Sequence, residues 1–386
     1  MPTHRLSAVV LLLLVPIILT AAVIKSAKLE AQAVTSPSGL KLSVEPVATN
    51  LDTIWDMVWA PDGEMWITER PGRVSHIDVK TGRVTAVGQI QDVYEQGESG
   101  LLGMTFHPDF PREPWIYFAH SFGTQGNIKN RLIRVRYDNG RLGATEILID
   151  NILGRTNHDG SRLAIGPDRM LYMTMGDAGQ QPLAQDRNSL NGKILRLTLD
   201  GKPAPGNPFN NDVWSWGHRN PQGLVFQPGT GTLYSSEHGP NSDDEVNRIE
   251  KGRNYGWPTV RGLCDTPEER EFCRANDVVE SVHQWTPTVG ISGADFYNHD
   301  LIPGWRGSLL VTSLVGRSLW RITLAPDGGR AVSVERLFEQ QYGRLRDVLT
   351  GADGAVYIAT SNHDGRARGI GPFEGDDKVL RITPAR

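Results

Sequence analysis

One short pattern recurs along this chain and limits its possible folds more than any other feature. A turn containing Pro or Asp with Gly precedes a run of β-branched, aromatic and aliphatic residues. Such a run, bounded by turn residues, is typical of a β-strand. Clear copies occupy residues 61–68, 167–174, 228–235 and 352–359, and looser copies occupy residues 107–118 and 304–311.

A second β-rich run follows several of these copies after a tight turn, at residues 72–77, 192–197, 317–322 and 378–382. Pairs of successive strands repeated along a chain are typical of β-propeller blades. The length of 386 residues suits one closed repeat architecture, and long amphipathic helices are absent from the pattern. We therefore predict an all-β fold: one six-bladed β-propeller of four-stranded antiparallel blades over residues 34–386. Five or seven blades are the alternatives, because two copies are weak.

The first 33 residues differ from the rest of the chain. Arg5 precedes an apolar run from Leu6 to Ile24, and residues 31–33 have the small-x-small form of a signal peptidase site. We expect an export signal over residues 1–33, cleaved near Ala33. The alternative is an uncleaved anchor, because the run approaches the length that spans a membrane. Both interpretations place the folded part in the periplasm or outside the cell.

The charge distribution and the cysteines indicate which partners and which cellular compartment fit this chain. The net charge is −4 with both signs mixed along the chain, so no basic stripe indicates nucleic-acid binding. Cys264 and Cys273 are the only cysteines and lie close together in the sequence. In an exported protein, such a pair favours a disulfide that fixes a loop.

Polar residues gather between the repeats, where propeller loops surround the central channel. His158 precedes a predicted strand, and Asp177 follows it. A His and a carboxylate on one blade could form a base with its orienting partner, although a loop His beside Asn and Asp is often only a turn residue. Arg344 and Arg346 stand two residues apart on a predicted strand, so they point the same way and suit an anionic ligand. The alternative for them is a solvated ion pair.

Residues 236–247 follow the next blade's strand and combine carboxylates with turn carbonyls. These are ligands that calcium prefers, although an acidic surface loop is the alternative interpretation.

Several uninterrupted stretches identify a resemblance to a known family: residues 100–110, 161–168, 217–224, 239–245 and 252–258. In this order they resemble the soluble sugar dehydrogenases that depend on pyrroloquinoline quinone (PQQ), which include glucose, sorbosone and aldose sugar dehydrogenases. The resemblance extends from about Leu51 to Ile382, nearly the whole predicted propeller.

The resemblance implies roles for individual residues. His158 would be the general base, and Asp177 the acidic residue that hydrogen-bonds it. Asn157 would lie on the cofactor side, at a position where the soluble glucose enzymes usually have Asp. Arg219 and Asn220 would contact the quinone carbonyl region.

The resemblance also implies that the Gly239 and Pro240 carbonyls hold a calcium ion and that Arg344 and Arg346 bind the PQQ carboxylates. Two positions depart from the family pattern. Residues 314–317 lack the family's cofactor-binding lysine, so Arg317 is the candidate to supply that charge. Glu98 is a further candidate cofactor contact, at a position where the sugar dehydrogenases have Gln near the active site.

The implied activity is PQQ- and calcium-dependent oxidation of the C1 hydroxyl of an aldose to a lactone, with an external quinone or cytochrome as electron acceptor. Two other classes remain open. One is a calcium-dependent, lactonase-type hydrolase, which the arginine pair disfavours. The other is a propeller that binds a ligand or protein without catalysis, which the missing lysine and Glu98 favour.

Overall fold

The computed structural model describes residues 31–367, 369–373 and 375–385. Residues 1–30, which make up most of the expected export signal, therefore lie outside the described part of the chain. The expected cleavage near Ala33 falls within the first strand, β1 (Gln32–Thr35). No helix among the described residues is long and apolar enough to cross a membrane.

The recurring sequence pattern forms one strand in each of six sheets, as predicted, including the two looser copies. These strands are β4 (Met65–Glu69), β8 (Trp115–Thr124), β12 (Leu171–Met175), β16 (Leu233–Glu237), β20 (Leu309–Ser313) and β24 (Val356–Thr360). All of them except β8 are buried along their whole length. Neighbouring sheets cover both faces of these strands, so their sequences are continuous apolar runs rather than alternating ones.

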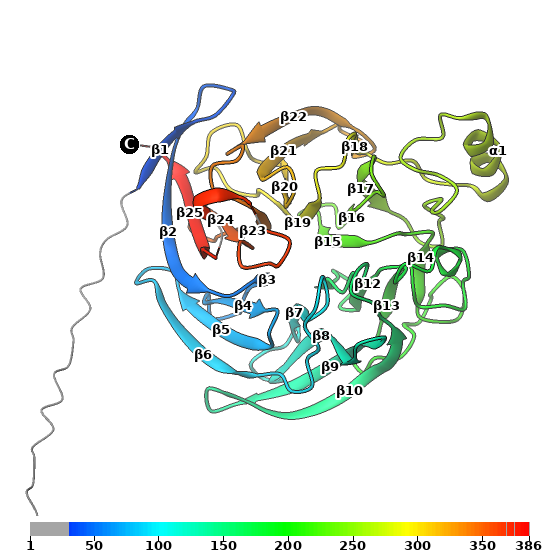
Figure 1. The fold of residues 1–386 in the computed structure, drawn as a ribbon, viewed down its shortest axis with the longest axis horizontal. Helices are drawn as coiled ribbons and strands as arrows, with labels where there is room; N and C mark the ends of the chain where they lie inside the picture. The colour runs from blue at the N-terminus through cyan, green and yellow to red at the C-terminus, as the bar shows by residue number, and fades with distance from the viewer. Residues whose placement is uncertain (1–30, 368, 374, 386) are drawn as a thin grey trace, which may run out of the picture. The chain divides into compact units, whose positions relative to one another are not determined.

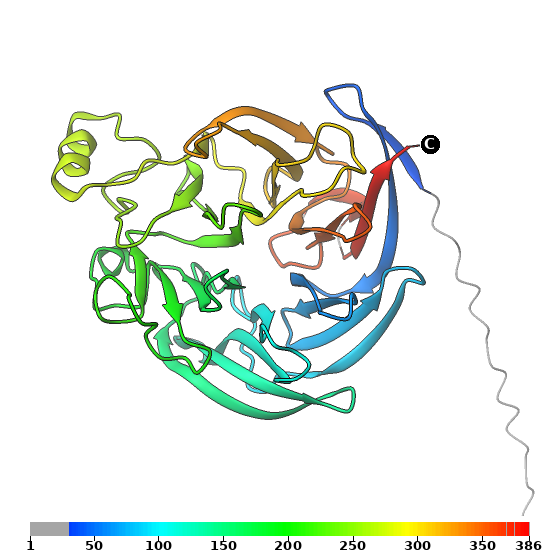
Figure 2. The ribbon, with the colours of Figure 1, turned by 180° about the vertical axis from the view of Figure 1, so that it is seen from behind.

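The six sheets follow one another around a central axis, which confirms the six-bladed propeller (Figures 1 and 2). In each blade the innermost strand pairs with the strand of the recurring pattern, and the third and fourth strands continue outward. The remaining strands are β3 (Ile54–Trp59), β5 (Arg73–Asp78), β6 (Arg83–Gln89), β7 (Leu101–Phe106), β9 (Asn127–Asp138), β10 (Arg141–Leu153), β11 (Leu163–Ile165), β13 (Lys193–Leu197), β14 (Val213–Trp216), β15 (Pro221–Phe226), β17 (Asp244–Ile249), β18 (His283–Trp285), β19 (Ile291–Phe296), β21 (Ser318–Leu324), β22 (Ala331–Leu337), β23 (Leu345–Thr350) and β25 (Asp377–Pro384).

The two ends of the described chain close the ring within one blade. β2 (Lys41–Leu51) pairs antiparallel with β25, from Leu42 opposite Pro384 to Leu51 opposite Asp377. β1 then pairs with β2 and adds a fifth strand to this blade, whereas the other five blades have four. The ring therefore closes by strand pairing between distant parts of the chain, which the local pattern could not predict.

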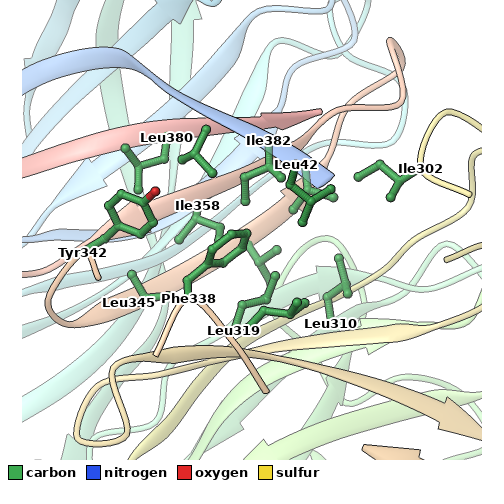
Figure 3. Close-up of a cluster of buried hydrophobic side chains, with 14 of the residues drawn as sticks. Leu42, Ile302, Leu310, Leu319, Phe338, Tyr342, Leu345, Ile358, Leu380 and Ile382 are labelled. Atoms are coloured by element: carbon green, nitrogen blue, oxygen red, sulfur yellow. The ribbon is translucent and has the colours of Figure 1, made fainter. Parts of the chain in front are cut away.

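Hydrophobic clusters fill the spaces between neighbouring blades. In the cluster of Figure 3, Leu42, Ile358 and Leu380 of the closing blade pack with Leu310 and Leu319 of the preceding one. Burying one such side chain contributes about 1.5–3 kcal/mol relative to leaving it exposed. The blades are therefore held to one another by apolar contacts, which leaves the strand ends at each rim free to carry polar residues.

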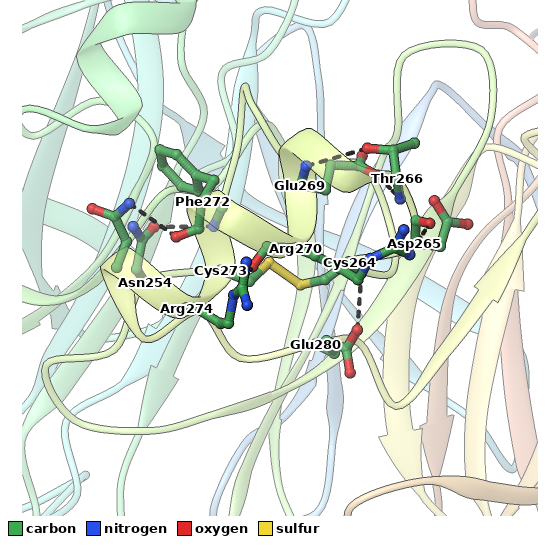
Figure 4. The surroundings of a disulfide bond; sticks show 12 residues. Asn254, Cys264, Asp265, Thr266, Glu269, Arg270, Phe272, Cys273, Arg274 and Glu280 are labelled. Carbon is green, nitrogen blue, oxygen red and sulfur yellow. Dashed lines mark hydrogen bonds between the residues drawn. A yellow bond between two sulfur atoms is a disulfide. The ribbon is translucent and has the colours of Figure 1, made fainter.

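The connection between β17 and β18 leaves the ring and contains the helix α1 (Pro267–Asn276) (Figures 1 and 4). Thr266 and Glu269 form a reciprocal capping box at its start. The predicted disulfide between Cys264 and Cys273 is confirmed and ties the helix to the preceding loop (Figure 4). Two short 3-10 helices, η1 (Gln181–Ala184) and η2 (Gly371–Phe373), complete the described elements.

Candidate active site

Blade topology brings the predicted site residues to one rim of the propeller. The first and second strands of a blade are antiparallel, so the start of the first and the end of the second lie at the same rim. His158 precedes β11, and Asp177 follows β12. The same rule applies to the other blades: Arg219 and Asn220 precede β15, Gly239 and Pro240 follow β16, and Arg344 precedes β23.

His158 and Asp177 form a hydrogen-bonded pair at this rim. His158 Nδ1 lies 2.7 Å from Asp177 Oδ1. Asp177 is fully buried and also accepts hydrogen bonds from the Gly179 N–H (2.7 Å) and the Trp257 Nε1–H (2.8 Å). Because an ionised carboxylate only accepts, it assigns the ring hydrogen to Nδ1 and leaves Nε2 as the basic atom.

Glu98 connects three loops beside this pair. Its Oε2 accepts from the His158 backbone N–H (2.8 Å) and from Asn220 Nδ2 (3.1 Å), while its Oε1 lies 2.6 Å from Arg366 NH1. Burial alone would raise the pKa of Glu98, but chiefly the charge of Arg366, helped by the hydrogen bond from the His158 backbone N–H, outweighs it and lowers that pKa to about 2. Glu98 is therefore an ionised bridge, and Arg366 balances its charge.

Three buried arginines converge on one carboxylate. Asp364 Oδ2 lies 3.1 Å from Arg344 NH2, 3.5 Å from Arg70 NH1 and 4.0 Å from Arg346 NH2. Arg70 also pairs with Glu95 at 3.1 Å. We call Arg70, Arg344 and Arg346 the arginine cluster. Three guanidinium groups therefore face two carboxylates, and the cluster retains positive charge.

The arginine cluster also has unused hydrogen-bonding capacity. The Nε atoms of all three side chains are buried and have no hydrogen-bond partner among the described residues. Burial lowers the pKa of Arg346 to about 9, although Asp364 opposes that shift. An anion with several acceptor oxygens would compensate the charge of such a cluster.

Arg219 and Asn220 lie between the His158–Asp177 pair and the loop after β16. Arg219 NH1 donates to the His238 carbonyl (3.0 Å), and its guanidinium lies 5.3 Å from the Trp257 ring centroid. Asn220 Oδ1 accepts from the Gly160 N–H and from Gln222 Nε2. Both side chains are thus held by the protein itself.

The loop after β16 presents oxygen atoms of the kind that calcium prefers. No described residue donates a hydrogen bond to the Gly239 or Pro240 carbonyl, while the Gly239 N–H is bound by Asp244 at 2.9 Å. Glu237, Asp243 and Glu245 also line the pocket that contains these two residues. The described residues contain no group of three His, Cys, Asp or Glu side chains arranged to hold a metal ion. A cation here would therefore depend on main-chain carbonyls and on its ligand.

Two of the predicted site residues, Asn157 and Arg317, lie outside the network of side-chain hydrogen bonds and ion pairs in the described part of the chain. Asn157 is half-buried, and neither it nor Arg317 makes a side-chain hydrogen bond or ion pair with the described residues. Arg317 lies in the turn between β20 and β21 at the same rim, with a backbone φ of 48°.

The sequence interpretation overlooked Arg70, Trp257, Asp364 and Arg366. A rule based on strand ends would have found Arg70 and Asp364, because both lie just after the second strand of their blades, as Asp177 does.

Fold and site together define a class of protein: a six-bladed β-propeller with a hydrogen-bonded His–Asp pair and a buried cluster of arginines at one rim. The sequence profile of the glucose/sorbosone dehydrogenases matches residues 51–369. The chain belongs to this family of oxidoreductases.

Three similar proteins support this assignment. The PQQ-bound aldose sugar dehydrogenase of Streptomyces coelicolor is 36% identical, with a TM-score of 0.77 over 90% of this chain and 99% of its own. A glucose dehydrogenase-type oxidoreductase of Thermus thermophilus is 42% identical, with a TM-score of 0.77 over 88% and 99%. Quinoprotein glucose dehydrogenase B of Acinetobacter calcoaceticus is 32% identical over 81% of this chain and 84% of its own.

Proposed function

We propose that this protein is a PQQ- and calcium-dependent aldose sugar dehydrogenase that oxidises the C1 hydroxyl of its substrate to a lactone. The observation that carries the proposal is the arginine cluster, with its excess of buried positive charge at the same rim as the His158–Asp177 pair. A polycarboxylate such as PQQ satisfies that charge. The similarity to a PQQ-bound aldose sugar dehydrogenase supports the same ligand.

In the proposed reaction, the sugar loses a hydride from C1 and a proton from its C1 hydroxyl, which together leave the carbonyl of a lactone. PQQ, when bound, would supply the acceptor for the hydride. His158 Nε2 accepts the hydroxyl proton, and the Asp177 carboxylate stabilises the imidazolium that forms. Asp177 is already in contact with Nδ1, so this stabilisation needs no movement of the pair.

The remaining site residues bind and orient the cofactor in this proposal. Arg344, Arg346 and Arg219 would hold its carboxylates and carbonyl edge, and the free carbonyls of Gly239 and Pro240 would hold calcium. Calcium would act as a Lewis acid on the quinone. Asn157, Asn220 and Arg317 remain candidate cofactor contacts, whereas Glu98 would position His158 and Asn220 through the hydrogen bonds described above.

The proposal includes export to the periplasm or the exterior, which the Cys264–Cys273 disulfide supports because disulfides persist in oxidising compartments. An external quinone or cytochrome would reoxidise the cofactor.

Calorimetric titration of the purified apoprotein with PQQ tests the proposal, with calcium present or with a chelator. We expect tight binding only with calcium, and dye-linked reduction when an aldose is added. Arg344→Gln should weaken binding. Arg112→Gln should not, because it makes the same charge change in the turn between β7 and β8, at the opposite rim. Failure of the wild-type protein to bind PQQ with calcium would overturn the proposal in favour of a non-catalytic binding propeller.

A further inference from the structure

The buried Asp177 carboxylate receives hydrogen bonds on both of its oxygens. On one side, Oδ1 accepts from His158 Nδ1 and from the Gly179 N–H, both at 2.7 Å. On the other side, Oδ2 accepts from the Trp257 indole at 2.8 Å. Asp177 is fully shielded from solvent, so water cannot replace any of these donors. Each oxygen of Asp177 is therefore required to be an acceptor.

Trp257 is held so that its indole N–H cannot easily turn away. Its side chain is buried, and its backbone N–H donates to the Gly217 carbonyl at 3.0 Å. Its own carbonyl accepts from Gln185 Nε2 at 2.6 Å, and the Arg219 guanidinium lies over its ring. Trp257 comes from the connection between β17 and β18, whereas His158 and Asp177 belong to the preceding blade. The neighbouring blade therefore supplies a fixed donor to the pair.

We propose that Trp257 is a positioning residue that fixes the tautomer of His158 by acting through Asp177. The indole N–H keeps Oδ2 an unprotonated acceptor and fixes the plane of the carboxylate, so that an acceptor oxygen always faces the His158 Nδ1–H. The basic lone pair then stays on Nε2. The importance of Trp257 for catalysis rests on the proposed function. The tautomer of His158, however, is a property of the apoprotein.

Asp177→Asn shows why the indole matters. An amide offers one oxygen and one NH2 group where the carboxylate offers two acceptors. With its oxygen toward His158, the NH2 group meets the Trp257 N–H. With its oxygen toward Trp257, the NH2 group meets the Gly179 N–H and donates to His158 Nδ1, which moves the ring hydrogen to Nε2. Either orientation of Asn therefore places two donors against each other.

Removing the indole donor resolves this conflict. In Asp177→Asn combined with Trp257→Phe, the amide can turn its oxygen toward His158 without meeting a donor, and Phe keeps an aromatic face for Arg219. The double variant should restore the Nδ1–H tautomer. It should also oxidise an aldose at least about tenfold faster than Asp177→Asn alone, since an unpaired buried donor carries a penalty of that order. If Trp257 had only a structural role, adding Trp257→Phe would instead lower the activity of Asp177→Asn further.

The test is long-range proton–nitrogen NMR of the His158 imidazole in the apoprotein, which distinguishes the two tautomers without cofactor or substrate. We expect Nδ1–H in the wild type, loss of that uniform state in Asp177→Asn, and its return in the double variant. Asp177→Asn combined with Trp59→Phe is the matched control. The Trp59 indole donates to the Thr350 carbonyl instead, so its loss should restore nothing. Equal tautomer populations in Asp177→Asn and the Trp257 double variant would overturn the inference.

Trp257→Phe alone provides a second measurement in case the Asn variants do not fold. Its carboxylate loses one fixed donor, so exchange of the His158 Nδ1 hydrogen with water should be about tenfold faster than in the wild type. Unchanged exchange would overturn the inference. Because both measurements use the apoprotein, their failure is distinct from failure of the wild type to oxidise aldoses, which would overturn only the proposed function.

Discussion

Replacing Asp364 with asparagine should strengthen the binding of PQQ, although it removes an ion-pair partner of buried arginines. Asp364 lies 3.1–4.0 Å from nitrogen atoms of the three arginines of the cluster. A ligand carboxylate that shares these guanidinium groups with Asp364 would lie about 5 Å from it, since each charge-assisted N–H···O contact is about 2.7–2.9 Å long. At an effective dielectric constant of about 20, two negative charges at this separation repel by roughly 3 kcal/mol. Removing one of them should lower Kd by about 100-fold, since each 1.4 kcal/mol is a factor of ten.

The same change should destabilise the apoprotein, because the arginines then lose their shared counter-charge. Breaking a buried ion pair from one side typically costs about 3–5 kcal/mol. Asparagine keeps an oxygen for Arg344, so its orientation should persist. The ligand-induced rise in Tm should therefore be larger in Asp364→Asn than in the wild type.

Calorimetric titration with PQQ and calcium, well below the Tm of the variant, measures the affinity directly. Circular dichroism establishes that the variant is folded. Arg344→Gln is the opposing change and should raise Kd by about tenfold or more, since it removes a charge-assisted contact of about 1.5–3 kcal/mol. If a folded Asp364→Asn binds PQQ equally well or more weakly than the wild type, Asp364 orients the arginines rather than competing for them, and the electrostatic reasoning is wrong.

Other predictions concern the base, the disulfide and pH. His158→Ala should bind PQQ normally but lose roughly two to four orders of magnitude in single-turnover reduction of bound PQQ, and an equal rate would place the base elsewhere. Cys264→Ser should lower the free energy of unfolding by about 2–3 kcal/mol in urea titrations, and an unchanged value would contradict this. Burial and the charge of Glu237 raise the pKa of Glu245 to about 8. Glu245 therefore loses its proton at a lower pH in the unfolded chain than in the folded one. The free energy of unfolding of the apoprotein, measured with a chelator present, should fall as pH rises from about 5 to 8. Glu245→Gln should reduce this dependence of stability on pH, and a variant with the wild-type pH profile would refute the prediction.

Local sequence determined the blades because strand and turn formation depends on neighbouring residues. The recurring pattern predicted the second strand of all six blades. The four runs at residues 72–77, 192–197, 317–322 and 378–382 predicted third strands. The position of His158 and Asp177 at opposite ends of a strand pair also followed from the sequence, since antiparallel pairing returns both to one rim. The resemblance to known enzymes added the roles of these residues, which the local pattern left open.

Only the tertiary structure decided which side chains meet across blades. Trp257 contacts Asp177 from 80 residues away, and Arg366 contacts Glu98 from 268 residues away. Such contacts depend on blade packing and on ring closure by β2 and β25, because they join loops that no local pattern relates. The same packing buries Arg70 and Asp364 with Arg344 and Arg346, whereas Arg317, equally basic in the sequence, makes no ion pair with the described residues. The charge of a residue is fixed by its sequence, but its partners and its burial are fixed by the closed ring.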